Sequence, residues 1–455
     1  MALIIKDHPF PFMEDQIPTN GMGTSSASTT IPQDSWLGWL RHGGRSVLEV
    51  QSLACPMETL NLGSHDYETH QYHERTRNIG NIEYANDRVQ MHQYHRLFHH
   101  PHIGGFSRPP SREEIFWALS LHTLEPPRRN WVSMAKDPQG SRRLQRKIDE
   151  ATPQENYRML NELKDHLHEL MKHPYGNFVI LKVFRSSNVT VDQKNTFIFF
   201  IIVDRQKLKD VCMHDLGNRV IQQILENNEI LITINLIAKA MRFITVALMK
   251  SFNGGYVIHQ CLRLFPPIHK NTILDVVAKN CYGIAIDRYG CCIIQKCIEH
   301  DDVPAFYQLV YNLILNAEDL ANDQYGNYVL QFLIKRKIWE VNALLILELR
   351  YKYVRLSTNK YASNVVENLL QFSRTVDAAM IAHEIMQSPD FLRVVQHQYG
   401  NYVVQRALQY TQGYLHESLR GIILSNNEKL NSCLYGKMVL QFVKGCSRRR
   451  GLESV

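Results

Sequence analysis

The stretch HQYGNYVVQ at residues 397–405 decides the fold, because close copies of it return along the chain at nearly constant spacing. The copies are HPYGNFVIL from 173, HDLGNRVIQ from 214, DRYGCCIIQ from 287, DQYGNYVLQ from 323 and NKYASNVVE from 359. We take the residue after the Gly or Ala as a register mark. The marks along the chain are Ser141, Asn177, Asn218, Gly255, Cys291, Asn327, Ser363, Asn401 and Lys437. Consecutive marks are 36, 41, 37, 36, 36, 36, 38 and 36 residues apart, and such a period predicts a solenoid of stacked helical units.

Each repeat is predicted to contain three helices, because apolar residues recur at helical spacing from residue 111 onward. The first helix is short, the second is longer and begins at the mark, and a third follows. Val329 and Leu330 are expected in the core. The Gly before each mark is expected to let its helix start close to the preceding one. The step of 41 indicates a five-residue insertion, expected as a longer loop around SSNVTVDQKN at residues 186–195.

These repeats resemble those of the Pumilio (PUF) family of RNA-binding proteins. The sequence YASNVVE is similar to the family's seventh repeat and is seventh here, and LYGKMVLQ at residues 434–441 is similar to its C-terminal cap. The resemblance covers residues 111–455, which would form a Pumilio homology domain of eight repeats capped at Lys437. It implies an all-α, right-handed superhelix, an α-solenoid.

The resemblance also implies which residues contact RNA. The register mark and the residue four places later lie on one helix face and would read the edge of one base, while the residue after the mark stacks on the base. Both reading residues are expected to face solvent in the free protein. The base-reading residues are Ser141 with Gln145, Asn177, Asn218 with Gln222, Gly255 with His259, Cys291 with Gln295, Asn327 with Gln331, Ser363 with Glu367, and Asn401 with Gln405. The stacking residues are Arg142, Phe178, Arg219, Tyr256, Tyr328, Asn364 and Tyr402.

The chemistry of each pair suggests its base. Asn with Gln offers a donor and an acceptor, which suits uracil, and a small Ser or Cys with Gln suits adenine. Ser with Glu suits guanine, because a carboxylate accepts from two N–H donors on that edge. In the family the RNA runs antiparallel to the protein, so repeats eight to five would specify 5′-UGUA.

Three positions depart from the family's pattern. Repeat two has Leu181 in place of Gln, and repeat four has Gly255 and His259, which match no standard pair. Repeat five has Cys292 where an aromatic residue or Arg is usual. The half of the site read by repeats one to four is therefore expected to contribute less to specificity.

The rest of the sequence points away from other classes. The net charge of +7 favours a polyanionic partner only mildly. Nine Cys without a C-x-x-C spacing, with Cys291, Cys292 and Cys297 on one helix, suggest buried reduced thiols. HELMKH at residues 168–173 has one residue too many for a zinc motif, and no nucleotide-binding or hydrolase motif occurs, so no enzyme, metal or cofactor is expected.

Residues 1–110 are rich in Ser, Thr, Gly, Pro, His, Asn and Gln without a helical or strand period, which predicts disorder. Ser111, followed by Arg and two Glu, resembles a helix start. The N-terminus lacks the apolar core of a signal peptide, and TFIFFIIV is too short to span a bilayer, so a cytoplasmic location is expected.

We therefore expect a monomer that binds single-stranded RNA containing UGUA in mRNA 3′ untranslated regions. It would regulate translation or decay by recruiting regulatory or mRNA-decay proteins on the convex face. Two alternatives remain open at this point: a protein-binding helical scaffold with weakened RNA recognition, and a nucleolar PUF-like factor of ribosome biogenesis.

Overall fold

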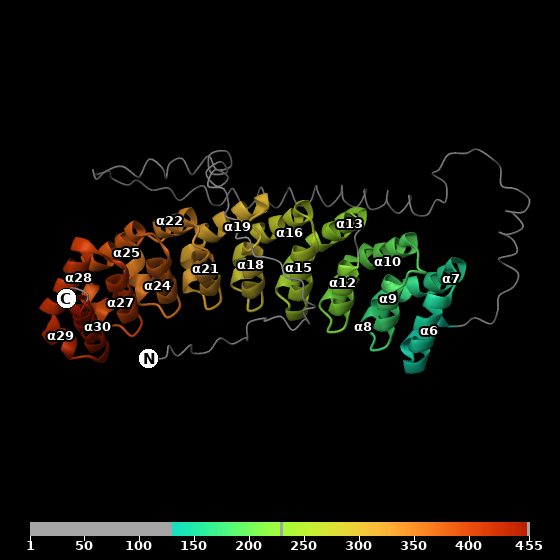
Figure 1. Ribbon diagram of the computed structural model, residues 1–455, viewed down its shortest axis with the longest axis horizontal. Coiled ribbons are helices and arrows are strands. Elements are labelled where there is room, and N and C mark those ends of the chain that lie inside the picture. The colour runs from blue at the N-terminus through green and yellow to red at the C-terminus, as the bar shows by residue number, and fades with distance from the viewer. Residues whose placement is uncertain (1–129, 228–230, 453–455) are drawn as a thin grey trace, which may run out of the picture. The chain divides into compact units, whose positions relative to one another are not determined.

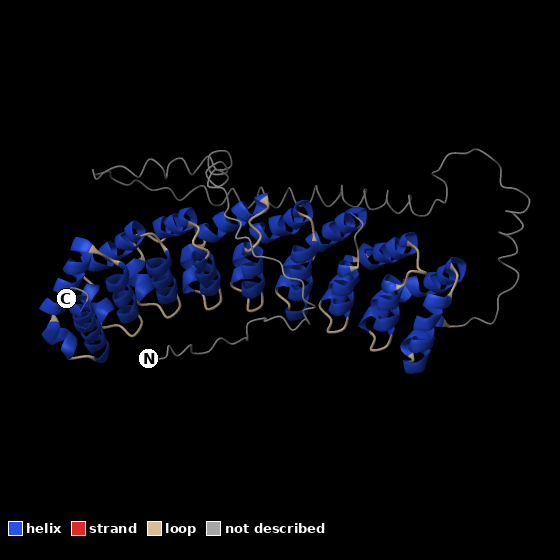
Figure 2. Ribbon diagram, viewed as in Figure 1, coloured by secondary structure: helices blue, strands red, loops and turns tan. Residues whose placement is uncertain are grey.

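The computed structural model describes residues 130–227 and 231–452, and within these residues the chain forms helices joined by short turns, without a strand (Figure 2). The predicted disorder over 1–110 and the predicted helix start at Ser111 lie outside the described residues.

Each repeat contains a short helix, a signature helix that carries the register mark, and an outer helix, as predicted. The short helices are α5 (Trp131–Lys136), α8 (Leu167–Lys172), α11 (Arg205–Cys212), α14 (Thr245–Met249), α17 (Cys281–Ala285), α20 (Ala317–Asn322), α23 (Tyr353–Ser357), α26 (Phe391–Val395) and α29 (Asn427–Asn431). The signature helices are α6 (Pro138–Glu150), α9 (Gly176–Arg185), α12 (Gly217–Glu226), α15 (Phe252–Leu264), α18 (Gly290–Ile298), α21 (Gly326–Lys335), α24 (Ala362–Phe372), α27 (Gly400–Tyr410) and α30 (Leu434–Leu452). The outer helices are α7 (Pro153–Leu163), α10 (Val191–Val203), α13 (Leu231–Arg242), α16 (Pro267–Lys279), α19 (Pro304–Leu315), α22 (Trp339–Glu348), α25 (Thr375–Gln387) and α28 (Gly413–Ser425), and the 3₁₀ turn η2 (Lys164–His166) follows α7.

The helices form two layers that continue from repeat to repeat. Each signature helix packs against the next one, from α6 through α30, and the outer helices from α10 to α28 pack in the same order. Figure 1 shows both rows, with α13 to α22 above α12 to α21. The core lies between the layers, where Val329, Leu330 and Leu333 are fully buried. The predictions of an all-α repeat fold and of inward-facing Val329 and Leu330 are confirmed.

In every repeat except the seventh, which has Ala362, the Gly before the register mark permits a close approach to the preceding short helix. A Cβ on Gly326 would lie 2.9 Å from the carbonyl oxygen of Leu320, and one on Gly400 would lie 2.4 Å from that of Val394. Real Cβ atoms do not approach backbone oxygens so closely. The expected role of these glycines is confirmed.

The prediction of a longer loop at residues 186–195 is correct only for residues 186–190, which join α9 to α10, whereas two residues join α24 to α25. The turn after α9 ends at Thr190, whose hydroxyl accepts from the backbone N–H of Gln193. The Gln193 side chain accepts from the Thr190 N–H in return. This capping box starts α10 at Val191. Extra residues also lengthen α11, which has 8 residues, whereas α14 and α17 have 5 each.

The cysteine prediction holds for two of the three residues on α18. Cys291 and Cys297 are buried, but Cys292 is exposed. It lies at the stacking position, where the residues of the neighbouring repeats, Tyr256 and Tyr328, are half-buried. Among the described helices, none is both long and apolar enough to cross a membrane.

Candidate nucleic-acid interface

The first reading residue of each pair is buried in the free protein. Asn401 is 0% exposed, Asn327 2% and Ser363 3%. The prediction that both reading residues face solvent is therefore wrong for the register mark. The second reading residues, including Gln331 and Gln405, are only partly buried.

The first reading Asn is buried because its amide closes the turn that precedes its own helix. Asn401 Nδ2 donates to the carbonyl oxygens of His397 and Gln398, both at 2.9 Å. Asn327 Nδ2 donates to Asp323 and Gln324 at 2.8 and 3.1 Å. Asn218 and Asn177 make the same two bonds in their own repeats. This Asn is thus a structural residue of the turn as well as a candidate reader.

The same Asn holds the second reading residue in place. Gln405 Nε2 donates to Asn401 Oδ1 at 3.1 Å, and Gln331 makes this bond to Asn327 at 2.8 Å. Gln222 and Asn218 form a third such pair at 2.9 Å. An amide has two N–H donors and a carbonyl oxygen that can accept twice. Each Gln therefore keeps one N–H and acceptor capacity on its oxygen for a ligand, although the Gln331 oxygen already accepts from Asn368. A donor beside an acceptor complements the Watson–Crick edge of uracil.

The first residue of each nine-residue copy, which we did not single out from the sequence, anchors the same turn. Asp323 Oδ1 accepts from the backbone N–H groups of Tyr325 and Gly326, at 2.8 and 2.7 Å. Asp287 and Asn359 do the same through oxygen, and His173 does so through Nδ1. The signal was present, because every copy begins with His, Asp or Asn, the residues that cap such turns.

The small first readers make different bonds. Ser141 Oγ donates to the Tyr175 carbonyl at 2.9 Å and accepts from Gln145 Nε2 at 3.1 Å. In repeat five, Gln295 Nε2 donates to the backbone carbonyl of Cys291 at 2.9 Å. These repeats orient the second reader without an Asn, which leaves more room for a large base.

Repeat seven carries the acidic second reader, Glu367. Its Oε2 lies 3.4 Å from Nε of Arg406, and its side chain is 21% exposed. Burial raises the pKa of the Glu367 carboxyl above its ordinary value, and the Arg406 guanidinium acts in the opposite direction. The carboxylate has no second protein donor within hydrogen-bond distance among the described residues. Two N–H donors from a ligand would complete it.

The stacking residues lie outward on the signature helices. Phe178 is 53% exposed and Tyr402 is 47% exposed. Arg142, Arg219 and Asn364 are also exposed, and Tyr256 and Tyr328 are half-buried. Exposed planar groups on one helix face can receive splayed bases. Their contact with RNA stays a prediction.

The repeat region matches the model of the PUF family, described as the Pumilio-family RNA binding repeat. The match covers residues 130–164, 166–191, 208–230, 253–278, 280–314, 316–336, 352–386 and 390–413, and each segment contains one of the first eight register marks. The chain belongs to the Pumilio family.

Curated relatives and solved structures agree with this assignment. Pumilio homolog 9 of Arabidopsis thaliana is 33% identical over 307 residues, which cover 67% of this chain and 53% of that protein. Pumilio homolog 12 of the same plant is 30% identical over 336 residues, covering 72% and 56%. The chain thus spans about half the length of these relatives.

Among solved structures, the Puf4 RNA binding domain bound to HO endonuclease RNA 3′ UTR recognition sequence has a TM-score of 0.56 and 26% identity, covering 68% of this chain and 97% of that one. Yeast Puf5p bound to MFA2 RNA has a TM-score of 0.59 at 22% identity, covering 73% and 99%, and supports the fold alone. The all-α repeat superhelix predicted from the sequence is confirmed.

Two repeats depart from the Pumilio pattern at their reading residues. In repeat two, Asn177 donates to the carbonyl oxygens of the preceding turn, but Leu181 has no polar atom with which to contact a base. In repeat four, a Cβ on Gly255 would lie 2.8 Å from Cδ1 of Ile293. The repeat-five side chain therefore takes the space that an Asn would need.

Within the part of the chain that the structure describes, no three His, Cys, Asp or Glu side chains could hold a metal.

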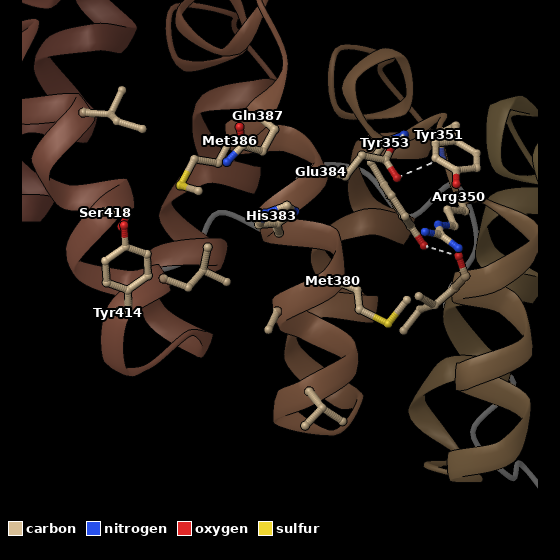
Figure 3. Close-up of a pocket in the computed structure, with 15 residues that line it drawn as sticks. Arg350, Tyr351, Tyr353, Met380, His383, Glu384, Met386, Gln387, Tyr414 and Ser418 are labelled. Carbon is tan, nitrogen blue, oxygen red and sulfur yellow. Dashed lines mark hydrogen bonds between the residues drawn. The ribbon is translucent and has the colours of Figure 1, made fainter. Parts of the chain in front are cut away.

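A separate groove of about 970 Å³ lies on the outer layer at α22, α25 and α28. Tyr351 is 81% exposed and Tyr414 is 89% exposed at its two sides, with Met380 between them (Figure 3). Tyr351 has a positive φ of 66°. The Glu384 carboxylate accepts from the backbone N–H groups of Tyr351 and Tyr353, at 2.8 and 2.9 Å. These hydrogen bonds hold the backbone at Tyr351, whose ring is exposed, in a conformation that is uncommon for a residue with a side chain.

Proposed function

We propose that this chain binds single-stranded RNA in a sequence-specific manner and so regulates the translation or stability of mRNA in the cytoplasm. Repeats eight, seven, six and five would read 5′-UGUA, and 3′ untranslated regions would hold the sites. The observation that carries this proposal is the recurrence of one hydrogen-bonded Asn–Gln pair, in one register, at Asn327–Gln331 and Asn401–Gln405.

The two pairs alternate with two purine-sized sites. Ser363 and Glu367 lie between the Asn–Gln pairs, and Cys291 with Gln295 follows toward the N-terminus. The Glu367 carboxylate, which can accept further hydrogen bonds beside its contact with Arg406, suits the N–H donors of guanine. The Asn–Gln pairs of the two neighbouring repeats suit uracil. The Puf4 domain similar to this chain is described in complex with an RNA 3′ UTR recognition sequence, which supports this type of target.

Unbiased selection from random RNA with the full chain tests the proposal. The expected result is enrichment of a UGUA core with weaker preferences on its 3′ side. A chain with Gln331→Ala and Gln405→Ala serves as the matched control and should lose the preference for both uracils. Absence of any enrichment would contradict RNA reading and favour the scaffold alternative.

The outer groove favours protein recruitment as a second function of the same chain. Its exposed rings, Tyr351 and Tyr414, and its Met380 suit a short apolar segment of a regulatory protein. Tethering the full chain to a reporter mRNA through an added RNA-binding tag isolates recruitment from RNA reading. Tyr351→Ala with Tyr414→Ala should abolish the reporter effect while leaving UGUA affinity unchanged. An unchanged reporter effect would show that the groove is not used.

A further inference from the structure

Two second reading residues are contacted across a repeat boundary, and always by the same position of the following repeat. The contacting residue is the one directly after that repeat's own second reader. Asn368 Nδ2 donates to Gln331 Oε1 at 3.2 Å, from repeat seven to repeat six. Arg406 Nε lies 3.4 Å from Glu367 Oε2, from repeat eight to repeat seven.

In other repeats this position bonds elsewhere. Lys182 pairs with Asp149, and Gln260 donates to Glu226 at 2.7 Å. Lys296 pairs with Glu299 of its own repeat at 3.3 Å. None of these partners is a reading residue. The contacts at Gln331 and Glu367 therefore differ from those of Lys182, Gln260 and Lys296, and they lie at the two central positions of the proposed core.

Arg406 is itself held in place. Its Nη1 donates to Gln409 Oε1 at 3.0 Å, three residues along α27, and its side chain is 30% exposed. The guanidinium thus lies along its own helix and against the preceding one. α24, which carries Glu367, packs against α20, α21, α23, α25 and α27. Of the charged groups on these helices, Arg406 is the one that acts on Glu367.

We propose that Arg406 is a positioning residue for the repeat before it, holding Glu367 as an oriented carboxylate that accepts both N–H donors of guanine. The inference rests on the proposed function, in which repeat seven reads guanine. Recognition at this repeat then requires four side chains rather than three: Ser363, Asn364, Glu367 and Arg406.

The physical reason is the competition between burial and charge. Burial favours the protonated form of Glu367, and this raised pKa means that the carboxylate is lost at a higher pH than for an exposed Glu. A protonated carboxyl has one O–H donor and can no longer accept from two N–H groups. Guanine selectivity should therefore be present at high pH and decline as the pH falls. Without the guanidinium the decline should begin at a higher pH.

Arg406→Met in the full chain tests this directly. The measurement is the ratio of dissociation constants for RNAs carrying guanine or adenine at the second core base, between pH 8 and pH 5.5. We expect the ratio to fall by about tenfold near neutral pH, the worth of one charge-assisted hydrogen bond. As the pH falls, the ratio for Arg406→Met should decline further, and it should change more than the wild-type ratio does over the same pH range.

Arg406→Lys keeps the positive charge and should restore most of the pH profile. Arg336→Met is the matched control, because it breaks another ion pair between repeats, Arg336–Asp301 at 2.9 Å, which touches no reading residue. It should leave the ratio unchanged. Melting curves of all variants show whether each one is folded.

Two results would overturn the inference. One is an Arg406→Met variant with the wild-type ratio and pH profile. The other is an equal loss of affinity for both RNAs with a shallower salt dependence, which would make Arg406 a phosphate contact. If the wild-type chain itself shows no guanine preference, the proposed register is wrong. If the wild-type chain prefers guanine and Arg406→Met does so equally, only the role of Arg406 is wrong.

Discussion

Repeats eight and two share the Asn that closes the turn before the signature helix, but they differ in the second reading residue. Asn401 and Asn177 each donate to two carbonyl oxygens of the preceding turn, at 2.7 to 2.9 Å. In repeat eight Gln405 donates to that Asn, whereas repeat two has Leu181 there. The comparison teaches that the Asn serves the fold in both repeats, and that the second residue decides whether a base edge can be read.

Repeats six and four differ at the first residue instead. Asn327 closes its turn, but Gly255 leaves its place to Ile293 of the next repeat. The turn in repeat four is capped by Ser251, whose hydroxyl accepts from Gly254 N–H at 3.4 Å, and α15 begins at Phe252. Stacking between repeats is therefore preserved where the reading pair is absent.

The largest expected effect comes from converting repeat seven into a copy of repeats six and eight. Ser363→Asn with Glu367→Gln should change the preferred core from UGUA to UUUA, with each preference worth about 1–3 kcal/mol. The new Asn can donate to the Asn359 and Lys360 carbonyls, which correspond to those that Asn327 uses. Competition binding with both RNAs measures the switch. A variant that still prefers guanine would refute the assignment of repeat seven to the second base.

One substitution in repeat two and one in repeat eight can distinguish the role of the Asn in the turn from its role in base recognition. Asn177→Ala and Asn401→Ala should each lower the free energy of unfolding by about 1–3 kcal/mol, because each turn loses two side-chain hydrogen bonds. Only Asn401→Ala should reduce base preference. Denaturant melts and competition binding on the same samples check both parts. A change in base preference from Asn177→Ala would show that repeat two reads RNA after all.

Stacking in repeat eight should be worth about 1–3 kcal/mol of RNA affinity, as measured by Tyr402→Ala. Tyr402 is 47% exposed, so its removal should leave the melting temperature nearly unchanged. Tyr157→Ala on α7 is a matched control, because this ring is 64% exposed on an outer helix. A parallel loss of thermal stability would mean that the Tyr402 ring serves packing between repeats.

A smaller gain is expected from completing repeat two. Leu181→Gln places an amide four residues after Asn177 and should add about 1 kcal/mol of preference for uracil at the base opposite that repeat. Leu181→Met is the control, since it keeps an apolar side chain of similar volume. Titration against RNAs that differ only at this base measures the gain. If RNAs with any of the four bases at this position bind Leu181→Gln equally, an Asn–Gln pair is not sufficient by itself to select uracil.

The smallest effects should come from the bases opposite repeats two and four in the wild-type chain. Each change there should alter affinity by less than about 0.5 kcal/mol, whereas each change in UGUA should cost about 1–3 kcal/mol. A complete set of single-base competitors provides the measurement. Equal sensitivity at all eight bases would remove the distinction between the two halves.

The sequence determined the repeat architecture and the identity of the candidate readers, because both depend on a pattern repeated in one register. Nine marks at a nearly constant step are enough to predict stacked helices, and Gly before the mark is enough to predict close approach. The insertion was placed only in part, because the capping box of Thr190 and Gln193 starts α10 at Val191 and ends the loop earlier than the composition of that segment suggested.

The tertiary structure alone decided the burial of Asn401, the exposure of Cys292 and the contact between Arg406 and Glu367. The two residues of that contact lie 39 positions apart. A periodic sequence specifies which residues share a helix face, since that depends on spacing along one chain segment. Which side chain of one repeat reaches into the next depends on rotamers and on the distance between stacked helices, and these are set only when the repeats pack together.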